Sequence, residues 1–189
     1  HLGKPDTVVE ELAAGFRVPA AVIEYAGRLL PAIAPSLALP HSIRRSRGDL
    51  RITTSTAVED DLAAAAKRAL AEPGSVGVIG PDVAIPAIQR ILDDHGLDHG
   101  VLGEAAEQPD EEAFSRRLDL VPASIAKGLE FDHVVLLEPA DIVAAEPDHR
   151  TGLRRLYVCL TRAVTSLQVV HSRPLPEELG GTAATTPAR

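Results

Sequence analysis

The chain alternates between short apolar runs and longer segments whose apolar residues recur at helical spacing. The short runs have the length and composition of strands, and they lie at 50–54, 75–79, 118–121, 134–137 and 167–170. The longer segments predict helices at 6–14, 20–30, 58–70, 83–94 and 153–164. Strands that alternate with helices in this way predict an α/β fold, with a mostly parallel sheet and helices on both faces.

The most apolar run follows a polar turn that carries candidate chemistry. Residues 134–137 (VVLL) do not alternate with polar positions, which is typical of a strand covered on both faces. The turn before it contains Lys127, Gly128 and Glu130. Loops at the ends of parallel strands often handle ligands, so these three residues form a functional hypothesis. The alternative from local chemistry is a solvated Lys-Glu pair at an ordinary turn.

The helix predicted at 153–164 has two different faces. At 100° per residue, Arg155, Val158 and Arg162 cluster opposite an apolar face. The arginines are either a solvated surface, or Arg162 projects into a cleft shared with another domain. In such a cleft a planar cation would stabilise charge on a transferring phosphate.

Two other groups of residues, three glycines and two histidines, do not match the ligand-binding motifs that they suggest. The spacing of Gly74, Gly77 and Gly80 matches neither a dinucleotide-binding nor a Walker A loop, so these glycines are interpreted as strand flanks. His95 and His99 lie in a glycine-containing turn without a third ligand, and a solvated loop is therefore expected there instead of a metal site.

Composition narrows the function classes. The 189 residues fit one domain, and the net charge of -8 argues against a chain that binds polyanions along its whole surface. A basic cluster at 44–47 is expected to be a solvated part of an irregular connector at 31–49, with phosphate contact as the alternative.

Cys159 is the single cysteine of the chain, which excludes an internal disulfide and fits a reducing cytoplasm. No apolar run approaches the ~20 residues that span a bilayer, so no membrane partner is expected. Because the chain begins at His1 and not at methionine, we expect a piece of a longer protein.

Three segments together resemble a known family. The sequence AKGLEFDHVVLLEP at 126–139 resembles motif V of UvrD/Rep-type superfamily 1 helicases. Similarly, RRLYVCLTRA at 154–163 resembles their motif VI, and GFRVPAAVIEYAGRLL at 15–30 resembles their motif IV. The segments occur in the family's order and the similarity runs from about 16 to about 179. It implies a three-layer RecA-like (P-loop NTPase-type) domain at 1–179, of the second or C-terminal type and without the family's large inserted subdomain. A disordered tail is expected at 180–189.

The resemblance also implies roles for individual residues. By position, Arg17 and Arg162 would contact the γ-phosphate of ATP, and Glu130 the ribose or nearby nucleotide. Gly128 would allow close approach, and Lys127 would have a supporting electrostatic part. ATP and Mg²⁺ would be held mainly by a first RecA-like domain with Walker A and Walker B motifs, which this sequence lacks. Alone, the chain is therefore expected to be inactive.

Several residues of this chain differ from the family's motifs, and these differences affect which partner is expected. Ser124 stands where translocating helicases have a histidine that contacts single-stranded DNA, and Gly15 and Phe16 replace the usual Asn-Tyr before Arg17. This combination, together with the closing HSRPLPEEL at 171–179, is similar to the HelD group of helicase IV-like ATPases from actinobacteria, which bind RNA polymerase. The expected partner is thus RNA polymerase, in the cytoplasm. The alternatives are a helicase that translocates on single-stranded DNA, with Ser124 in its binding surface, and a non-catalytic interaction domain.

Overall fold

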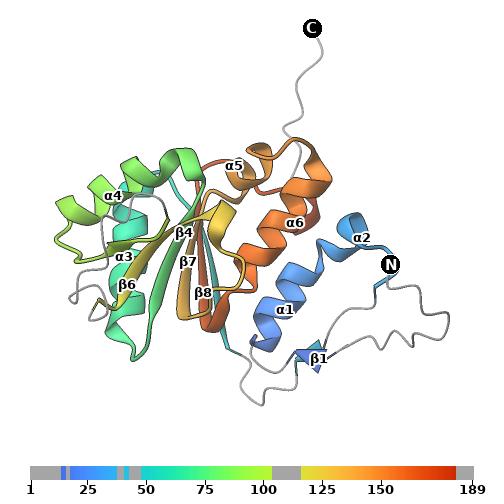
Figure 1. Ribbon diagram of the computed structural model, residues 1–189, viewed down its shortest axis with the longest axis horizontal. Coiled ribbons are helices and arrows are strands. Elements are labelled where there is room, and N and C mark those ends of the chain that lie inside the picture. The colour runs from blue at the N-terminus through green and yellow to red at the C-terminus, as the bar shows by residue number, and fades with distance from the viewer. Residues whose placement is uncertain (1–13, 16–17, 38–40, 43–47, 104–115, 182–189) are drawn as a thin grey trace, which may run out of the picture.

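The centre of the molecule is a sheet of six parallel strands in the order β3-β8-β7-β4-β6-β5 (Figure 1). The computed structural model describes residues 14–15, 18–37, 41–42, 48–103 and 116–181. The strands of the sheet are β3 (Asp49–Thr54), β4 (Val76–Gly80), β5 (Gly100–Val101), β6 (Leu118–Pro122), β7 (Phe131–Leu137) and β8 (Ala163–His171). Two short strands, β1 (Ala14–Gly15) and β2 (His41–Ser42), pair with each other in parallel apart from this sheet.

Helices cover both faces of the sheet, as the pattern predicts. Figure 1 shows α3 (Val58–Ala71) and α4 (Ile85–Asp94) on one face, and α1 (Ala20–Gly27) and α6 (His149–Leu160) on the other. Two short helices, α2 (Leu30–Ile33) and α5 (Pro139–Ala144), join the layer of α6. The predicted α/β fold, with a parallel sheet between two helical layers, is confirmed.

Strand β7 explains why its run of apolar residues does not alternate. Val134 and Leu136 belong to the apolar core under α1 and α6, while Val135 and Leu137 belong to the core under α3 and α4. All four side chains are buried, because neighbouring residues of a strand point to opposite faces and each face of this sheet has a helical layer.

The helix predicted at 20–30 is two helices. The first ends at Gly27, and Pro31 lies in the first turn of α2 instead of ending a longer helix. A proline is tolerated there because the first turn of a helix needs no backbone N–H donor.

The helix predicted at 153–164 was placed too late in the chain. Helix α6 begins at His149, after Asp148 caps it by accepting a hydrogen bond from the Thr151 amide at 2.9 Å, and it ends at Leu160. Ala163 already pairs with Phe131 of β7, so strand β8 starts four residues before the start of the predicted 167–170 run. The boundary between α6 and β8 depends on hydrogen bonds to the neighbouring strand β7, which the helical spacing of apolar residues does not reveal.

The sequence pattern did not predict several elements of the structure. The short edge strand β5 and helix α5 were not predicted, and neither were the 3-10 turns of the described chain at η1 (Asp82–Ala84), η3 (Ala123–Ile125) and η4 (Glu177–Leu179). The helix predicted at 6–14 lies outside the described residues except for Ala14, which is in β1. The basic cluster at 44–47 and residues 182–189 of the predicted tail also lie outside them. No helix in the described part of the chain has the length and apolarity to cross a membrane.

The glycine and histidine interpretations need correction. Gly77 and Gly80 lie within β4 instead of flanking it. An added Cβ on Gly77 would come within 2.5 Å of the Phe131 ring, so this glycine makes room for the residue that opens β7. The side chain of His99 is only 5% exposed, and its Nδ1 lies 2.9 Å from the carbonyl oxygen of Leu97, so it is a packed side chain and not a solvated one.

Candidate functional site

The candidate residues lie on a crossover of eight residues, 123–130, which joins β6 to β7. Both strands pair with β4, one on each side, so the crossover starts at the carboxyl end of β6, passes β4 and reaches the amino end of β7. Lys127, Gly128 and Glu130 therefore lie just before a strand begins, and not at the carboxyl edge of the sheet. The crossover contains only the short turn η3, and it packs against α6.

Small buried residues let the crossover lie close to α6. Ala123 and Ala126 belong to the apolar core together with Cys159 and Leu160 of the helix. The Cys159 sulfur lies 3.8 Å from the carbonyl oxygen of Ala123, within reach of a weak S–H donor. Burial raises the pKa of the Cys159 thiol to about 12, with opposing effects from Arg155 and Arg162. The thiol is thus protonated and shielded while helix and crossover remain in contact.

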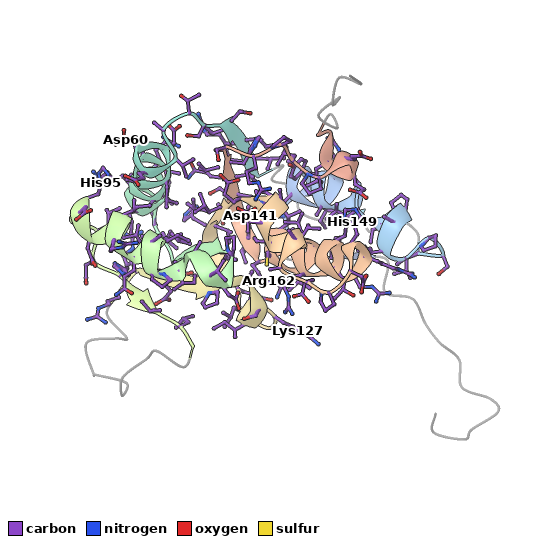
Figure 2. The ribbon with its side chains drawn as sticks, turned by 90° about the horizontal axis from the view of Figure 1, so that it is seen from above. Asp60, His95, Lys127, Asp141, His149 and Arg162 are labelled. Atoms are coloured by element: carbon purple, nitrogen blue, oxygen red, sulfur yellow. The ribbon has the colours of Figure 1, made fainter. Side chains whose placement is uncertain are left out.

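The middle of the crossover faces solvent. Lys127, Gly128 and Glu130 are exposed, and Figure 2 shows the Lys127 side chain extending away from the body of the molecule. Gly128 has a φ of +87°, a backbone conformation that favours glycine, and an added Cβ there would meet no atom within 4 Å. The backbone at Gly128 can therefore be approached closely by a ligand.

Arg162 holds the far end of the crossover. The residue follows α6, and its half-buried guanidinium donates from one terminal nitrogen to the carbonyl oxygen of Leu129 at 2.9 Å. Its Nε donates to the carbonyl oxygen of Val158, also at 2.9 Å. The backbone adds a further link, because the Phe131 amide donates to the carbonyl oxygen of Arg162 at 3.0 Å. Arg162 is thus fixed next to Glu130 and Gly128.

The orientation of Arg162 leaves donors available. A guanidinium has five N–H groups. Within the described part of the chain, three of them have acceptors: the carbonyl oxygens of Leu129 and Val158, and the hydroxyl of Thr161 at 3.3 Å. One N–H on each terminal nitrogen is left, a pair that suits the oxygens of a phosphate. Burial raises the pKa of the neighbouring Tyr157 hydroxyl against the effect of Arg162, so this phenol stays neutral.

Ser124, the candidate for nucleic-acid contact, uses its backbone within the protein. Its amide donates to the Asp82 carboxylate at 3.0 Å, and its carbonyl oxygen accepts from Arg155 at 2.8 Å. The same Arg155 donates through Nε to Glu146 at 2.7 Å. Ser124 therefore sits at the start of the crossover, linked to the turn after β4 and to α6.

Sequence reasoning missed the contribution of Arg155. The alternative of a solvated arginine face does not hold for this residue, whose side chain is 30% exposed and bonded on two sides. Its spacing offered a clue, since two helical turns separate it from Arg162 and residues so spaced share one face of a helix. Only the tertiary structure shows that both arginines hold the same crossover.

The structure places Arg162 against Leu129, within the segment that contains Lys127, Gly128 and Glu130, whereas Ser124 lies nearer the start of the crossover and is held by Arg155. Arg17 lies outside the described residues, so its role stays a prediction. The helix that follows it, α1, packs in the same apolar core as α6. Among the described residues, no group of three or more histidine, cysteine, aspartate or glutamate side chains is placed to hold a metal ion.

Comparison with solved structures identifies the fold. The chain superposes on the C-terminal domain of a possible DNA helicase from Lactobacillus plantarum WCFS1 with a TM-score of 0.63 and 17% identity, over 90% of this chain and 95% of that one. This chain has the RecA-like fold. Less extensive likenesses include the UvsW helicase of bacteriophage T4, with a TM-score of 0.46 and 15% identity over 76% of this chain and 51% of that one. No known family profile and no curated protein matches the sequence.

Proposed function

We propose that this chain is the second RecA-like domain of an ATP-driven motor and supplies one half of an ATP site between two domains. Arg162 contacts the γ-phosphate across the cleft, and Arg17 acts beside it. Gly128 and Glu130 face the nucleotide, with Lys127 adding positive charge. A first RecA-like domain holds most of the ATP and its Mg²⁺, and ATP-driven closure of the two domains does mechanical work.

The observation that carries the proposal is the bond between Arg162 and the carbonyl oxygen of Leu129. It places an oriented arginine with N–H groups to spare beside an open glycine and an exposed carboxylate. An arginine held in this way loses little conformational freedom when a phosphate arrives, which is what electrostatic stabilisation of phosphoryl transfer requires. The chain's own residues bind and orient, and ATP supplies the phosphate that is transferred.

We further propose RNA polymerase as the macromolecule on which the motor acts, in the bacterial cytoplasm. The similarity to the HelD group supports this partner, and so does the replacement of the DNA-contacting histidine by Ser124. Both backbone groups of Ser124 are engaged within the protein. A motor that translocates on single-stranded DNA is the second candidate, and it is favoured by the overall likeness to motif V.

The test uses a protein in which this domain is joined to a RecA-like domain with a Walker A motif. Replacement Arg162→Ala should lower ATP turnover by about 10³-fold or more, the typical contribution of an arginine finger. Arg154→Ala is the matched control, because Arg154 is exposed, follows α6's first turn and, among the described residues, donates its hydrogen bond to the Ile33 carbonyl oxygen, at 3.4 Å. Turnover within threefold of the control in Arg162→Ala would remove the arginine from the site.

Stimulation of ATP turnover distinguishes the two proposed partners, RNA polymerase and single-stranded DNA. If RNA polymerase is the partner, it should raise ATP turnover while single-stranded DNA does not. Stimulation by single-stranded DNA alone, weakening as salt is raised, would instead identify a DNA-translocating motor.

A further inference from the structure

Arg155 links α6 to two other segments, the residues between α5 and α6 and the crossover. From the middle of α6 it donates to the Glu146 carboxylate, which follows α5, and to the carbonyl oxygen of Ser124 in the crossover. The Glu146 side chain is 18% exposed and that of Arg155 is 30% exposed, so solvent screens this pair only in part. Because the carboxylate fixes one edge of the guanidinium, the other edge is aimed at the crossover.

The start of the crossover is held from two directions. Arg155 binds the Ser124 carbonyl oxygen, and Asp82 accepts a hydrogen bond from the Ser124 amide. One residue before, the carbonyl oxygen of Ala123 faces the buried Cys159 thiol. The first turn of the crossover is thus attached to α6 and to the turn that follows β4.

The end of the crossover is held by the same helix. Arg162 follows α6 two turns after Arg155 and binds the carbonyl oxygen of Leu129. The exposed residues Lys127, Gly128 and Glu130 lie between these two attachment points. A loop of eight residues with only one short 3-10 turn would otherwise have considerable conformational freedom, and bonds to a residue of α6 and to the residue that follows its C-cap remove much of it.

We propose that Arg155 is a positioning residue, which attaches the start of the 123–130 crossover to α6, while Arg162, just after the same helix, holds the other end. Movement at Ser124 is then transmitted along α6 and the crossover to Arg162. As far as ATP is concerned, this inference rests on the function proposed above. Its structural part can be tested on this chain alone.

The first experiment measures how fast a thiol reagent modifies Cys159, the single cysteine. The side chain is fully buried and faces the crossover, so modification requires the helix and crossover to separate. Arg155→Ala should speed the reaction at least tenfold in dilute urea, with a slope against urea much smaller than that of global unfolding. Glu146→Ala should change the rate in the same direction by a smaller factor, because it removes only the group that aims Arg155.

Arg154→Ala is the matched control, since the neighbouring arginine touches α2 and not the crossover. Its labelling rate should stay within twofold of the unmodified protein. The proposal is overturned if Arg155→Ala labels no faster than this control. It is also overturned if the increase follows the full urea dependence of global unfolding, because Arg155 would then contribute only to overall stability.

The second experiment separates this inference from the proposed function. In the protein joined to a Walker A domain, Arg155→Ala should raise the KM for ATP about tenfold while kcat changes less than threefold, since the residue positions nucleotide-facing groups without touching ATP. If Arg162→Ala abolishes turnover but Arg155→Ala leaves KM unchanged, the proposed function stands and the positioning role fails. If Arg162→Ala leaves turnover unchanged, the proposed function fails, and the labelling result alone decides the structural part.

Discussion

Arginines on two different faces of α6 hold different parts of the molecule. On one face, Arg150 and Arg154 donate to the carbonyl oxygen of Ile33, the last residue of α2. On the other, Arg155 from the middle of α6 and Arg162 just after its end donate to the two ends of the crossover. Every one of these arginines binds a backbone carbonyl oxygen, so the chemistry is alike and only the segment that is held differs.

The difference separates architecture from candidate function. Arg150 and Arg154 hold α2, which belongs to the apolar core. Arg155 and Arg162 set a loop whose middle is exposed and whose glycine is open to a ligand. We therefore expect substitutions in the first half of α6, up to Arg154, to lower stability without loosening the crossover, and three predictions test that distinction.

The largest effect is expected at Gly152, where α6 crosses α5. An added Cβ would lie 2.3 Å from the carbonyl oxygen of Val143, a backbone atom that cannot move aside alone. Gly152→Ala should therefore lower the free energy of unfolding by about 3 kcal/mol in urea titrations, although alanine usually stabilises a helix. Gly96→Ala is the control, because its Cβ meets no atom within 4 Å and its φ of +65° costs only about 1 kcal/mol. Equal losses in the two variants would contradict the close packing of the helices.

The role of Gly152 could not be predicted from the sequence, although the sheet and its helical layers could. The apolar runs predicted the sheet and its helical layers because burial on both faces leaves a local pattern at positions such as 134–137. A glycine inside a helix carries no such pattern, since its reason is the backbone of α5 on the other side of the contact. The start of α6 at Asp148 and the early start of β8 at Ala163 were missed for a similar reason, as each depends on hydrogen bonds that periodicity does not report.

The candidate site was predictable to a different degree. Local chemistry alone favoured a solvated surface for Lys127 and Glu130, and the resemblance in motif order made them candidates. The structure then added Arg155 and the Leu129 carbonyl oxygen, neither of which has a recognisable motif role. A carbonyl oxygen cannot be selected from a sequence, because every residue has one and only the fold decides which of them receives an arginine.

A smaller effect is expected from Arg150 and Arg154, the arginines of α6 that hold α2. The Ile33 carbonyl oxygen receives two bonds from Arg150, at 3.2 and 3.0 Å, and a longer one from Arg154 at 3.4 Å. Arg154→Ala should cost less than about 0.5 kcal/mol, while the double variant Arg150→Ala/Arg154→Ala should cost about 2 kcal/mol because the carbonyl oxygen loses all of these donors. The labelling rate of Cys159 in dilute urea should remain that of the unmodified protein in both variants. Rapid labelling with a shallow urea dependence would show that the contacts of α6 with α2 and its contacts with the crossover are not separable.

The smallest effect is a pH dependence at Asp148, the residue that caps α6. Hydrogen bonds from the amide and then the hydroxyl of Thr151 hold the pKa of this carboxyl below its ordinary value. A lowered folded-state pKa means that the carboxylate stabilises the protein above the unfolded-state value of about 4, and that this contribution is lost as the pH falls through the folded-state pKa. Asp148→Asn keeps a good capping residue without the charge. The Tm of Asp148→Asn should therefore lie below that of the unmodified protein at pH 6 and converge with it towards pH 2.

Asp119 in β6 is a control for which the opposite pH dependence is expected. Burial raises the pKa of its carboxyl, so the unmodified protein should gain stability relative to Asp119→Asn as the pH falls towards 4. A Tm difference for Asp148→Asn that stays constant with pH would assign the cap to hydrogen-bond geometry alone, without a contribution from charge at this end of α6.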